Sequence, residues 1–332
     1  MNFDFSVCYN YLMQKYRIAI LRGGPSDEHD VSLKSGGNII QTLSPHHSIV
    51  DIIIDKNADW YISGMKVEPA HALKSTDVVL NALHGSYGED GKVQQILDHV
   101  GIPYSGSRAL ASALGMHKWR AKEIFKLAGL KTPHGRKITS DMDINEQALQ
   151  IFKTFSFPVI IKPISSGSSV GVSVARDLQS LEESLVSVFS YCDTALVEEY
   201  IKGKEATCVV AEGFRNQKHY AFPPIEIMKH TDLAFDSEMK YSGKIEERCP
   251  GNFSQIEKDA IMQASINAHV AIGARHYSRS DFIIHPTRGI YILEINTLPG
   301  LTETSLLPKA LTAVGSNMNE FLHHLIKQAI EG

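Results

Sequence analysis

The sequence predicts an α/β protein built from two or three packed lobes. At 332 residues, 43% of them hydrophobic, the chain is long enough to bury more than one core. Near the N-terminus, apolar runs of strand length alternate with helical segments, which is typical of a parallel sheet with crossover helices. Later strand pairs are separated by short glycine-containing loops, which indicates antiparallel sheets.

An N-terminal α/β lobe is expected at 17–106, after a short extension at 1–16. Its first strand leads into Gly23 and Gly24, and a helix follows with Asp30 as its candidate N-cap. The expected strands are 17–21, 48–54, 77–83 and 102–104, and the expected helices are 31–43 and 91–100.

Two further lobes with antiparallel sheets are expected at 107–204 and 205–332. Residues 229–252 show no sustained period, so we expect a long ordered loop there. The expected strands are 158–162, 170–175, 195–200, 206–211, 278–284 and 290–295. The stretch 108–128 is expected to be rich in helix, and further helices are expected at 178–189, at 253–274 and from the last strand to the C-terminus.

Composition argues against several classes of function. The 33 basic and 37 acidic residues give a net charge of −4, and no basic run could neutralise a nucleic-acid backbone. The apolar stretches are far shorter than the roughly 20 residues that span a bilayer, and residues 1–16 do not read as a signal peptide. The four cysteines are widely separated, so we expect free thiols in a reducing cytoplasm and not a zinc site.

The strongest chemical signal is a pair of acids near the C-terminus. Strand alternation sets Arg279 with Asp281 on one face, and Glu294 with Asn296 on one face. A simple hairpin register brings the two carboxylates opposite each other, where their repulsion calls for a nearby cation. Two carboxylates and an amide oxygen are ligands that Mg²⁺ takes beside nucleotide phosphates. A surface hairpin is the alternative, but the apolar neighbours favour an interior sheet.

Two loops suggest anion binding. Lys162 ends an apolar strand and is followed by the Gly/Ser segment 165–171, whose N–H groups can surround phosphate oxygens, although ordinary hairpin turns look alike. Downstream of the acid pair, the Pro-Gly turn in 297–305 offers N–H groups before a helix, or makes only a turn.

Three other segments indicate ligand contacts. Residues 195–205 predict a strand that runs into a linker with acids facing a nucleoside, or simply a charged strand edge. The segments 23–28 and 82–91 lie at the carboxyl ends of expected parallel strands, where ligands of open α/β sheets bind. His84 alone would count as a structural histidine, but three neighbouring glycines favour a site role.

In combination, these motifs resemble those of the D-alanine–D-alanine ligases, which are ATP-grasp enzymes. The resemblance covers about 17–315 and rests on ordered blocks: Gly-Gly-Pro-Ser-Asp-Glu-His-Asp-Val-Ser, His-Gly-x-x-Gly-Glu-Asp-Gly, Gly-Ile-Pro-Tyr-Ser-Gly-Ser, Met-His-Lys, Ile-Lys-Pro, Gly-Ser-Ser-Val-Gly, Lys-Tyr, Arg-Ser-Asp and Glu-Ile-Asn-Thr-x-Pro-Gly. It implies the ATP-grasp fold, with the central and C-terminal lobes forming the nucleotide-binding part. It also implies ligation of two D-alanine molecules through an acyl phosphate, for peptidoglycan precursor synthesis.

The resemblance also implies roles for particular residues. Two metal ions, either Mg²⁺ or Mn²⁺, would be held by Asp281, Glu294 and Asn296. ATP would be bound by Lys118, Lys162, Ser168, Glu198, Glu199, Ile201, Glu205 and Lys240. The catalytic set would be Glu28, Ser168, Tyr241, Arg279 and the Gly300 N–H, and D-alanine would be bound by Glu28, His84, Ser305 and Leu306. The loop with Lys240 and Tyr241 would be a lid that excludes water.

The sequence departs from the family pattern at three positions: Arg22 precedes the Gly-Gly pair, His117 replaces an aspartate before Lys118, and Ser166 stands where an acid is common. Two alternatives to the dipeptide ligase are a D-alanine–D-lactate or D-serine ligase and a catalytically silent nucleotide-binding protein of the same fold. The presence of Tyr241 favours the dipeptide product. By analogy with the family we expect a cytoplasmic homodimer with small-molecule substrates only.

Overall fold

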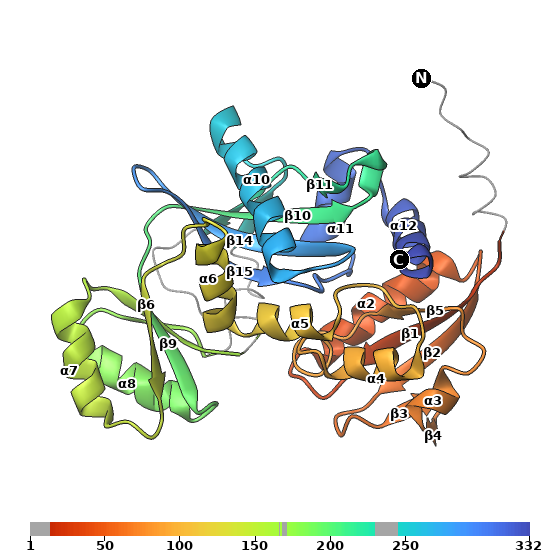
Figure 1. The fold of residues 1–332 in the computed structure, drawn as a ribbon, viewed down its shortest axis with the longest axis horizontal. Coiled ribbons are helices and arrows are strands. Elements are labelled where there is room, and N and C mark those ends of the chain that lie inside the picture. The colour runs from red at the N-terminus through yellow and green to blue at the C-terminus, as the bar shows by residue number, and fades with distance from the viewer. Residues whose placement is uncertain (1–13, 166, 168–170, 230–244) are drawn as a thin grey trace. The chain divides into compact units, whose positions relative to one another are not determined.

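The computed structural model describes residues 14–165, 167, 171–229 and 245–332 (Figure 1). The chain groups into two compact units. Unit 1 holds the chain up to Ala109 together with Leu298–Gly332, and unit 2 holds Leu110–Thr297. The three lobe ranges expected from sequence remain a prediction.

Unit 1 contains a five-stranded sheet in the order β4-β3-β2-β1-β5. Strand β1 pairs in parallel with both β2 and β5, which agrees with the expected parallel lobe. Its residues Ile18–Leu21 are fully buried, because helices cover both faces of such a sheet. The strands are β1 (Arg17–Gly23), β2 (Ser48–Ile54), β3 (Trp60–Ile62), β4 (Met65–Val67) and β5 (Val78–Asn81).

The helices of unit 1 include two from the C-terminus of the chain. Helix α12 packs against α2 and β5, so the last segment belongs to this core. The helices are α2 (His29–Leu43), α3 (Pro69–Ala72), α4 (Lys92–Val100), α11 (Leu306–Ala313) and α12 (Met318–Glu331).

Two sequence predictions in unit 1 are wrong in detail. Helix α2 begins at His29 with Glu28 in the N-cap position, and Asp30 lies in its first turn, where a carboxylate still favours the helix dipole. The expected strand at 102–104 is reduced to a single parallel bridge between Val79 and Tyr104.

The first sheet of unit 2 is four-stranded, with the order β6-β9-β7-β8 and antiparallel pairing throughout. Two helices pack on one face and bury residues such as Ile151, Leu185 and Val197. The expected hairpin around the Gly/Ser loop is confirmed by the β7–β8 pairing. The elements are β6 (Gly135–Thr139), α7 (Ile144–Thr154), β7 (Val159–Pro163), β8 (Ser173–Ala175), α8 (Leu178–Phe189) and β9 (Thr194–Glu199).

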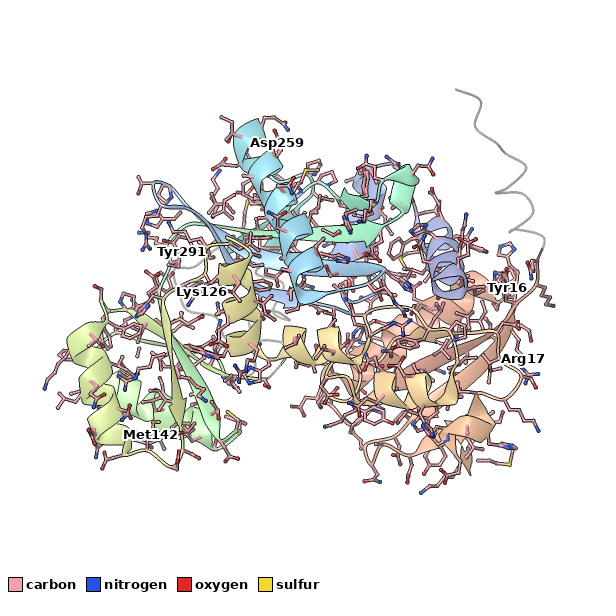
Figure 2. All side chains as sticks on the ribbon, in the orientation of Figure 1. Tyr16, Arg17, Lys126, Met142, Asp259 and Tyr291 are labelled. Atoms are coloured by element: carbon pink, nitrogen blue, oxygen red, sulfur yellow. The ribbon has the colours of Figure 1, made fainter. Side chains whose placement is uncertain are left out.

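The second sheet of unit 2 has the order β13-β12-β10-β14-β15, with β11 pairing to β10. Helices α6 and α10 pack against this sheet (Figure 1). The elements are α5 (Ala109–Met116), α6 (Lys118–Leu127), β10 (Lys204–Glu212), the short 3₁₀ helix η1 (Phe214–Asn216), β11 (His219–Ala221), β12 (Ile225–Lys229), β13 (Ile245–Arg248), α10 (Gln255–Ile272), β14 (Tyr277–His285) and β15 (Gly289–Asn296). Asp259 lies on the exposed side of α10 (Figure 2).

Helix ends follow the expected capping chemistry. Ser254 and Glu257 form a capping box at the start of α10, and Gly273 ends the helix in the left-handed conformation. Among the described residues, the helices are too short or too polar to serve as membrane spans.

Two of the three departures from the family pattern have a structural role. His117 is the N-cap of α6, where its Nδ1 accepts the Arg120 N–H, as an aspartate carboxylate would. Burial lowers the pKa of His117, which favours the neutral ring that this bond requires. Arg22 of β1 forms a two-pronged ion pair with Asp51 of β2, at 2.7 and 2.6 Å. Ser166 lies outside the described residues.

Candidate active site

Strands β14 and β15 place the two expected metal-binding acids opposite each other. Asp281 pairs with Glu294, and Arg279 pairs with Asn296. The opposition of the two carboxylates predicted from the sequence is therefore confirmed, but the simple hairpin register is wrong between Phe282 and His285, which pair one position off it. Both acids are partly exposed, with side-chain exposures of 24% and 39%, so a ligand can reach them.

A β-bulge produces this register. Phe282 pairs with Ile292 while Asp281 pairs with Glu294, so Leu293 is an extra residue on β15. Ile292 and Ile295 both lie in the core that includes α10 residues, three positions apart. Because strand faces alternate every residue, Glu294 would lie on the same face as Ile292 without the extra residue. The bulge turns Glu294 to the face opposite that core.

Each of these acids is paired with a cation. Arg279 donates from Nε and Nη2 to the two carboxylate oxygens of Asp281, both at 2.9 Å. Lys118 Nζ lies 3.2 Å from Glu294 Oε2. Thr207 of β10 donates a further hydrogen bond to Asp281. The positive charge that the opposed acids were expected to need is therefore supplied by two side chains of the chain itself.

The donor set fits a hard divalent cation shared with a ligand. Asp281, Glu294 and Asn296 offer carboxylate and amide oxygens, which suit Mg²⁺. Within the described part of the chain, no group of three or more His, Cys, Asp and Glu side chains gathers at a metal-binding distance. With only two acids, the set suits an ion that completes its shell with phosphate and water oxygens.

A second cluster of charges is buried. Glu198 of β9 lies between Lys122 of α6 and Lys162 of β7, with Nζ–Oε distances of 2.7 Å to each. The side chains of Lys122, Lys162 and Glu198 are 3%, 9% and 3% exposed. Lys162 and Glu198 share the face of the sheet opposite the α7–α8 core, because they occupy alternate positions to Ile161 and Val197.

The pKa values in this cluster reflect competing effects. Burial acts to raise the pKa of Glu198, but Lys122 and Lys162 outweigh it, so the carboxyl pKa is lowered and the group stays ionised. Burial is also the main cause that lowers the pKa of Lys122 to about 8. Sequence reasoning missed Lys122. Its spacing of four residues from Lys118 sets both lysines on one face of α6, and this was the available signal.

Unit 1 brings two expected substrate-binding residues close together. A Cβ atom on Gly85 would come within 2.9 Å of a Glu28 carboxylate oxygen, so the left-handed Gly85, next to His84, gives this acid room. His84 Nε2 bonds to Ser35 Oγ at 2.8 Å, and its Nδ1 lies 3.5 Å from Glu89. Burial raises the pKa of Glu89, and the nearby Glu28 adds to this effect. Glu89 is a second residue of this region that the sequence analysis missed.

The Pro-Gly turn precedes α11 in unit 1. Ser305 is the N-cap residue and Leu306 the first residue of that helix. The Thr302 N–H donates to Ser305 Oγ at 3.1 Å, and a Cβ on Gly300 would come within 2.9 Å of the same oxygen. Within unit 1, the Asn38 side chain of α2 donates to the Leu301 carbonyl at 2.7 Å and so holds the turn against that helix.

The remaining expected ATP-binding residues are dispersed. Glu199 accepts hydrogen bonds from the His134 N–H at 3.0 Å and from Arg288 at 2.9 Å, so its side chain does not join the buried cluster. Ile201 is buried after β9, and Glu205 belongs to β10. Ser168, Lys240 and Tyr241 lie outside the described residues.

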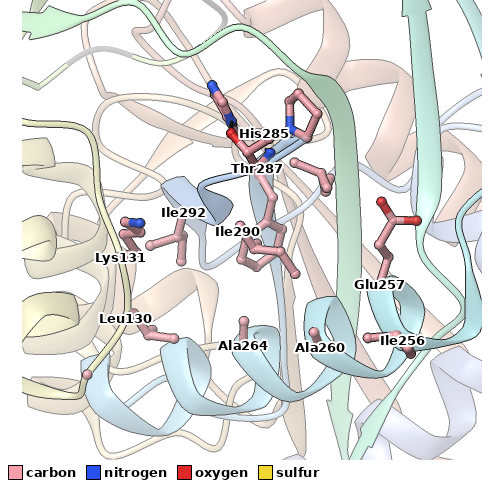
Figure 3. A pocket seen from close by; sticks show the side chains of 15 residues that line it. Leu130, Lys131, Ile256, Glu257, Ala260, Ala264, His285, Thr287, Ile290 and Ile292 are labelled. Carbon is pink, nitrogen blue, oxygen red and sulfur yellow. Dashed lines mark hydrogen bonds between the residues drawn. The ribbon is translucent and has the colours of Figure 1, made fainter.

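A cavity of about 530 Å³ lies elsewhere in unit 2, between α10, the loop after α6 and the β14–β15 hairpin (Figure 3). Its lining combines residues of the α10 core face, including Phe282, Ile284 and Ile292, with polar residues at its rim such as Lys131 and Glu257. Among the residues that the structure describes, no expected site residue lines it. The cavity and the acid pair are therefore on opposite faces of the sheet.

Comparison with known proteins gives a consistent result. Family models described as the D-ala D-ala ligase N-terminus and C-terminus match residues 17–72 with 63–107 and residues 124–327. The D-alanine–D-alanine ligase of Desulforamulus reducens is 35% identical over 95% of this chain and 99% of its own length.

Solved structures agree. The D-alanine–D-alanine ligase of Bacillus anthracis complexed with ATP has a TM-score of 0.79 at 31% identity, covering 96% of this chain and 98% of that one. The VanG D-Ala:D-Ser ligase of Enterococcus faecalis has a TM-score of 0.81 at 27% identity, covering 95% of this chain and 100% of that one. The match of both family models and the identity to curated relatives over nearly the whole length lead to one conclusion: the chain belongs to the D-alanine–D-alanine ligase family and has the ATP-grasp fold.

Proposed function

We propose that this chain joins two D-alanine molecules into D-alanyl-D-alanine at the expense of ATP, as a step of peptidoglycan precursor synthesis. The carboxylate of the first D-alanine attacks the γ-phosphorus of ATP, and ADP leaves. The amine of the second D-alanine then attacks the acyl phosphate, and phosphate leaves. The observation that carries the proposal is the opposition of Asp281 and Glu294, each paired with a cation.

In this proposal Asp281, Glu294 and Asn296 hold two Mg²⁺ or Mn²⁺ ions. When bound, the metal neutralises charge on the phosphates during phosphoryl transfer. The ion pairs of Glu294 with Lys118 and of Asp281 with Arg279 suggest that these side chains exchange partners when ligands bind. With metal bound to the acids, Lys118 would contact the phosphates and Arg279 would donate to the developing oxyanion of the tetrahedral intermediate. The Gly300 N–H is the second proposed donor to that oxyanion.

Substrate positions are proposed from the residues of unit 1. Glu28 receives the ammonium of the first D-alanine beside His84. Ser305 and Leu306 receive the carboxylate of the second, because the first turn of a helix offers unpaired N–H groups to an anion. Ser168, Lys240 and Tyr241 keep the lid and phosphate roles that the family resemblance implies.

Nucleotide contacts are proposed in unit 2. Lys162 contacts the phosphates, while Glu198, Glu199, Ile201 and Glu205 surround the nucleoside. The solved structure of the related Bacillus anthracis enzyme in complex with ATP supports ATP as cosubstrate. A cytoplasmic homodimer that binds no nucleic acid and no membrane is proposed from the family resemblance.

Phosphate release with ATP, Mg²⁺ and D-alanine tests the proposal, with L-alanine as the matched control substrate. We expect release only with D-alanine, together with one D-alanyl-D-alanine per phosphate by chromatography. Binding of ATP without D-alanine-dependent release would instead identify a silent nucleotide-binding protein.

The acceptor is tested separately. The similarity to a D-Ala:D-Ser ligase makes D-serine a necessary competitor beside D-lactate. In a pH series with labelled D-alanine, D-lactate and D-serine present together, we expect D-alanyl-D-alanine as the main product at each pH. Predominant D-lactate incorporation below neutrality would contradict the dipeptide assignment.

A further inference from the structure

A buried carboxylate with two ammonium partners raises a question about ATP binding. In the proposed function, Lys162 must reach the phosphates, yet its Nζ lies 2.7 Å from Glu198 Oε2. If Lys162 were the only partner, its departure would leave Glu198 as an uncompensated charge in a side-chain environment that is 3% exposed. Removing one partner from a buried ion pair is strongly unfavourable, so the departure of Lys162 would oppose ATP binding.

We propose that Lys122 is a positioning residue that neutralises Glu198 while Lys162 transfers to the nucleotide. This inference rests on the proposed function. Lys122 Nζ lies 2.7 Å from Glu198 Oε1, whereas Lys162 contacts the other carboxylate oxygen, Oε2, so both lysines share one acid. The cluster of two lysines and one glutamate carries a net charge of +1, which suits a site that receives a polyanion.

The geometry of Lys122 leaves bonding capacity for this exchange. Although Nζ and Glu198 Oε1 are 2.7 Å apart, neither buried atom has a hydrogen-bond partner of good geometry. When Lys162 leaves, a small rotation of the Glu198 carboxylate gives Lys122 a charge-assisted hydrogen bond, which is stronger than a hydrogen bond between neutral groups. Lys122 therefore offsets the loss of Lys162 at the moment when ATP needs that lysine.

Lys122 is also fixed in place. It lies one helical turn after Lys118, in a helix capped at its start by His117. Its side chain is 3% exposed, which leaves little freedom to follow the nucleotide. Lys162, by contrast, is the last residue but one of β7, just before the Gly/Ser segment. One lysine is thus held as the permanent partner of Glu198, and the other is placed to leave it.

The test compares Lys122→Met with Lys122→Arg in the full-length enzyme. Without Lys122, Lys162 stays bound to Glu198. For Lys122→Met we expect KM for ATP and Kd for a non-hydrolysable ATP analogue to rise by about tenfold or more. The KM for D-alanine should stay near that of the wild type, and kcat should fall by less than about threefold. Lys122→Arg keeps the charge and should retain most of the ATP affinity.

A double variant separates this role from a merely structural one. In the Glu198→Gln background no buried acid holds Lys162, so Lys122→Met should lower analogue affinity there much less than it does in the wild type. A general packing defect would not produce this non-additivity. If Lys122→Met folds poorly by its thermal midpoint, Lys122→Gln replaces it in both arms.

Three outcomes overturn the inference: unchanged analogue affinity in Lys122→Met, a defect confined to kcat, or a loss of affinity from Lys122→Met that is as large in the Glu198→Gln background as in the wild type. Analogue binding is measured by calorimetry without turnover. A wild-type enzyme that binds the analogue but releases no phosphate would therefore contradict the proposed function while still testing Lys122.

Discussion

Asp281 lies opposite Glu294 because Leu293 is a bulged residue of β15. The bulge lets Ile292 and Ile295 both enter the α10 core while Glu294 and Asn296 face the other way. In the same region Lys118 and Arg279 each pair with one of the acids. The site therefore keeps its charges paired before any metal or nucleotide arrives, and the following predictions depend on that arrangement.

Glu294→Gln should lose catalysis far more than stability. The change removes a proposed metal ligand while the shape is kept, so we expect kcat to fall by about 100-fold or more. The partly exposed pair with Lys118 contributes at most about 1 kcal/mol, so the free energy of unfolding in urea should change by no more than that. Asp259→Asn, the same type of change on the exposed face of α10, is the control and should keep wild-type turnover. A fully active Glu294→Gln enzyme would remove the metal assignment.

Metal removal should stop turnover without unfolding the protein. Lys118 and Arg279 already compensate Glu294 and Asp281, so no acid of this pair is left without a partner when the metal is absent. With EDTA we expect phosphate release to cease and the thermal midpoint, measured by circular dichroism, to stay within about 2 °C. Added Mg²⁺ should restore turnover. A large drop in the midpoint would indicate a structural metal and contradict this site model.

His117→Ala should destabilise the protein by about 1 kcal/mol, because α6 loses its N-cap acceptor for the Arg120 N–H. His117→Asp restores the acceptor and adds a negative charge at the helix N-terminus, so it should be at least as stable as the wild type. Urea unfolding of the three proteins measures the difference. If alanine and aspartate behave alike, the capping role of His117 is wrong.

A pair of histidines should make unit 1 sensitive to acid. His47 Nδ1 accepts the Tyr16 N–H, and its Nε2 lies 3.1 Å from Nε2 of His323. His323 Nδ1 donates to the Asn319 carbonyl, so its Nε2 must accept the proton of a neutral His47. Burial, followed by His323, His46 and Lys15, lowers the pKa of His47 from 6.5 to about 4.

The direction of the pH effect follows from that shift. The unfolded chain takes up a proton on His47 near pH 6.5, whereas the folded protein resists protonation down to about pH 4. The stability contributed by the neutral ring is therefore present above pH 6.5 and is lost as the pH falls. The difference in unfolding free energy between the wild type and His47→Gln should shift by about 2 kcal/mol against the wild type as the pH falls from 7 to 5. A difference that does not vary with pH would contradict the neutral histidine pair.

Much of the site could be predicted because its motifs are local. The hairpin at 278–295 places acids at strand positions, and the helix at 178–189 is found with the expected bounds. The register of Asp281 and Glu294 was predicted from a simple hairpin, but the tight end of β14–β15 pairs His285 with Gly289, and the register reaches Glu294 only through the bulge. The alternation of apolar residues alone does not reveal a bulge. An extra residue can be recognised only when it is known which face of the strand packs against the core.

The sequence by itself determined the fold class, the strand-borne acids and lysines, and the family, because strand period, turn residues and motif order are properties of short segments. Only the tertiary structure decided that Lys122 shares Glu198 with Lys162 and that Leu293 turns Glu294 away from the core. A buried ion cluster depends on which segments distant in sequence pack together, and burial then controls the strength of each charge interaction.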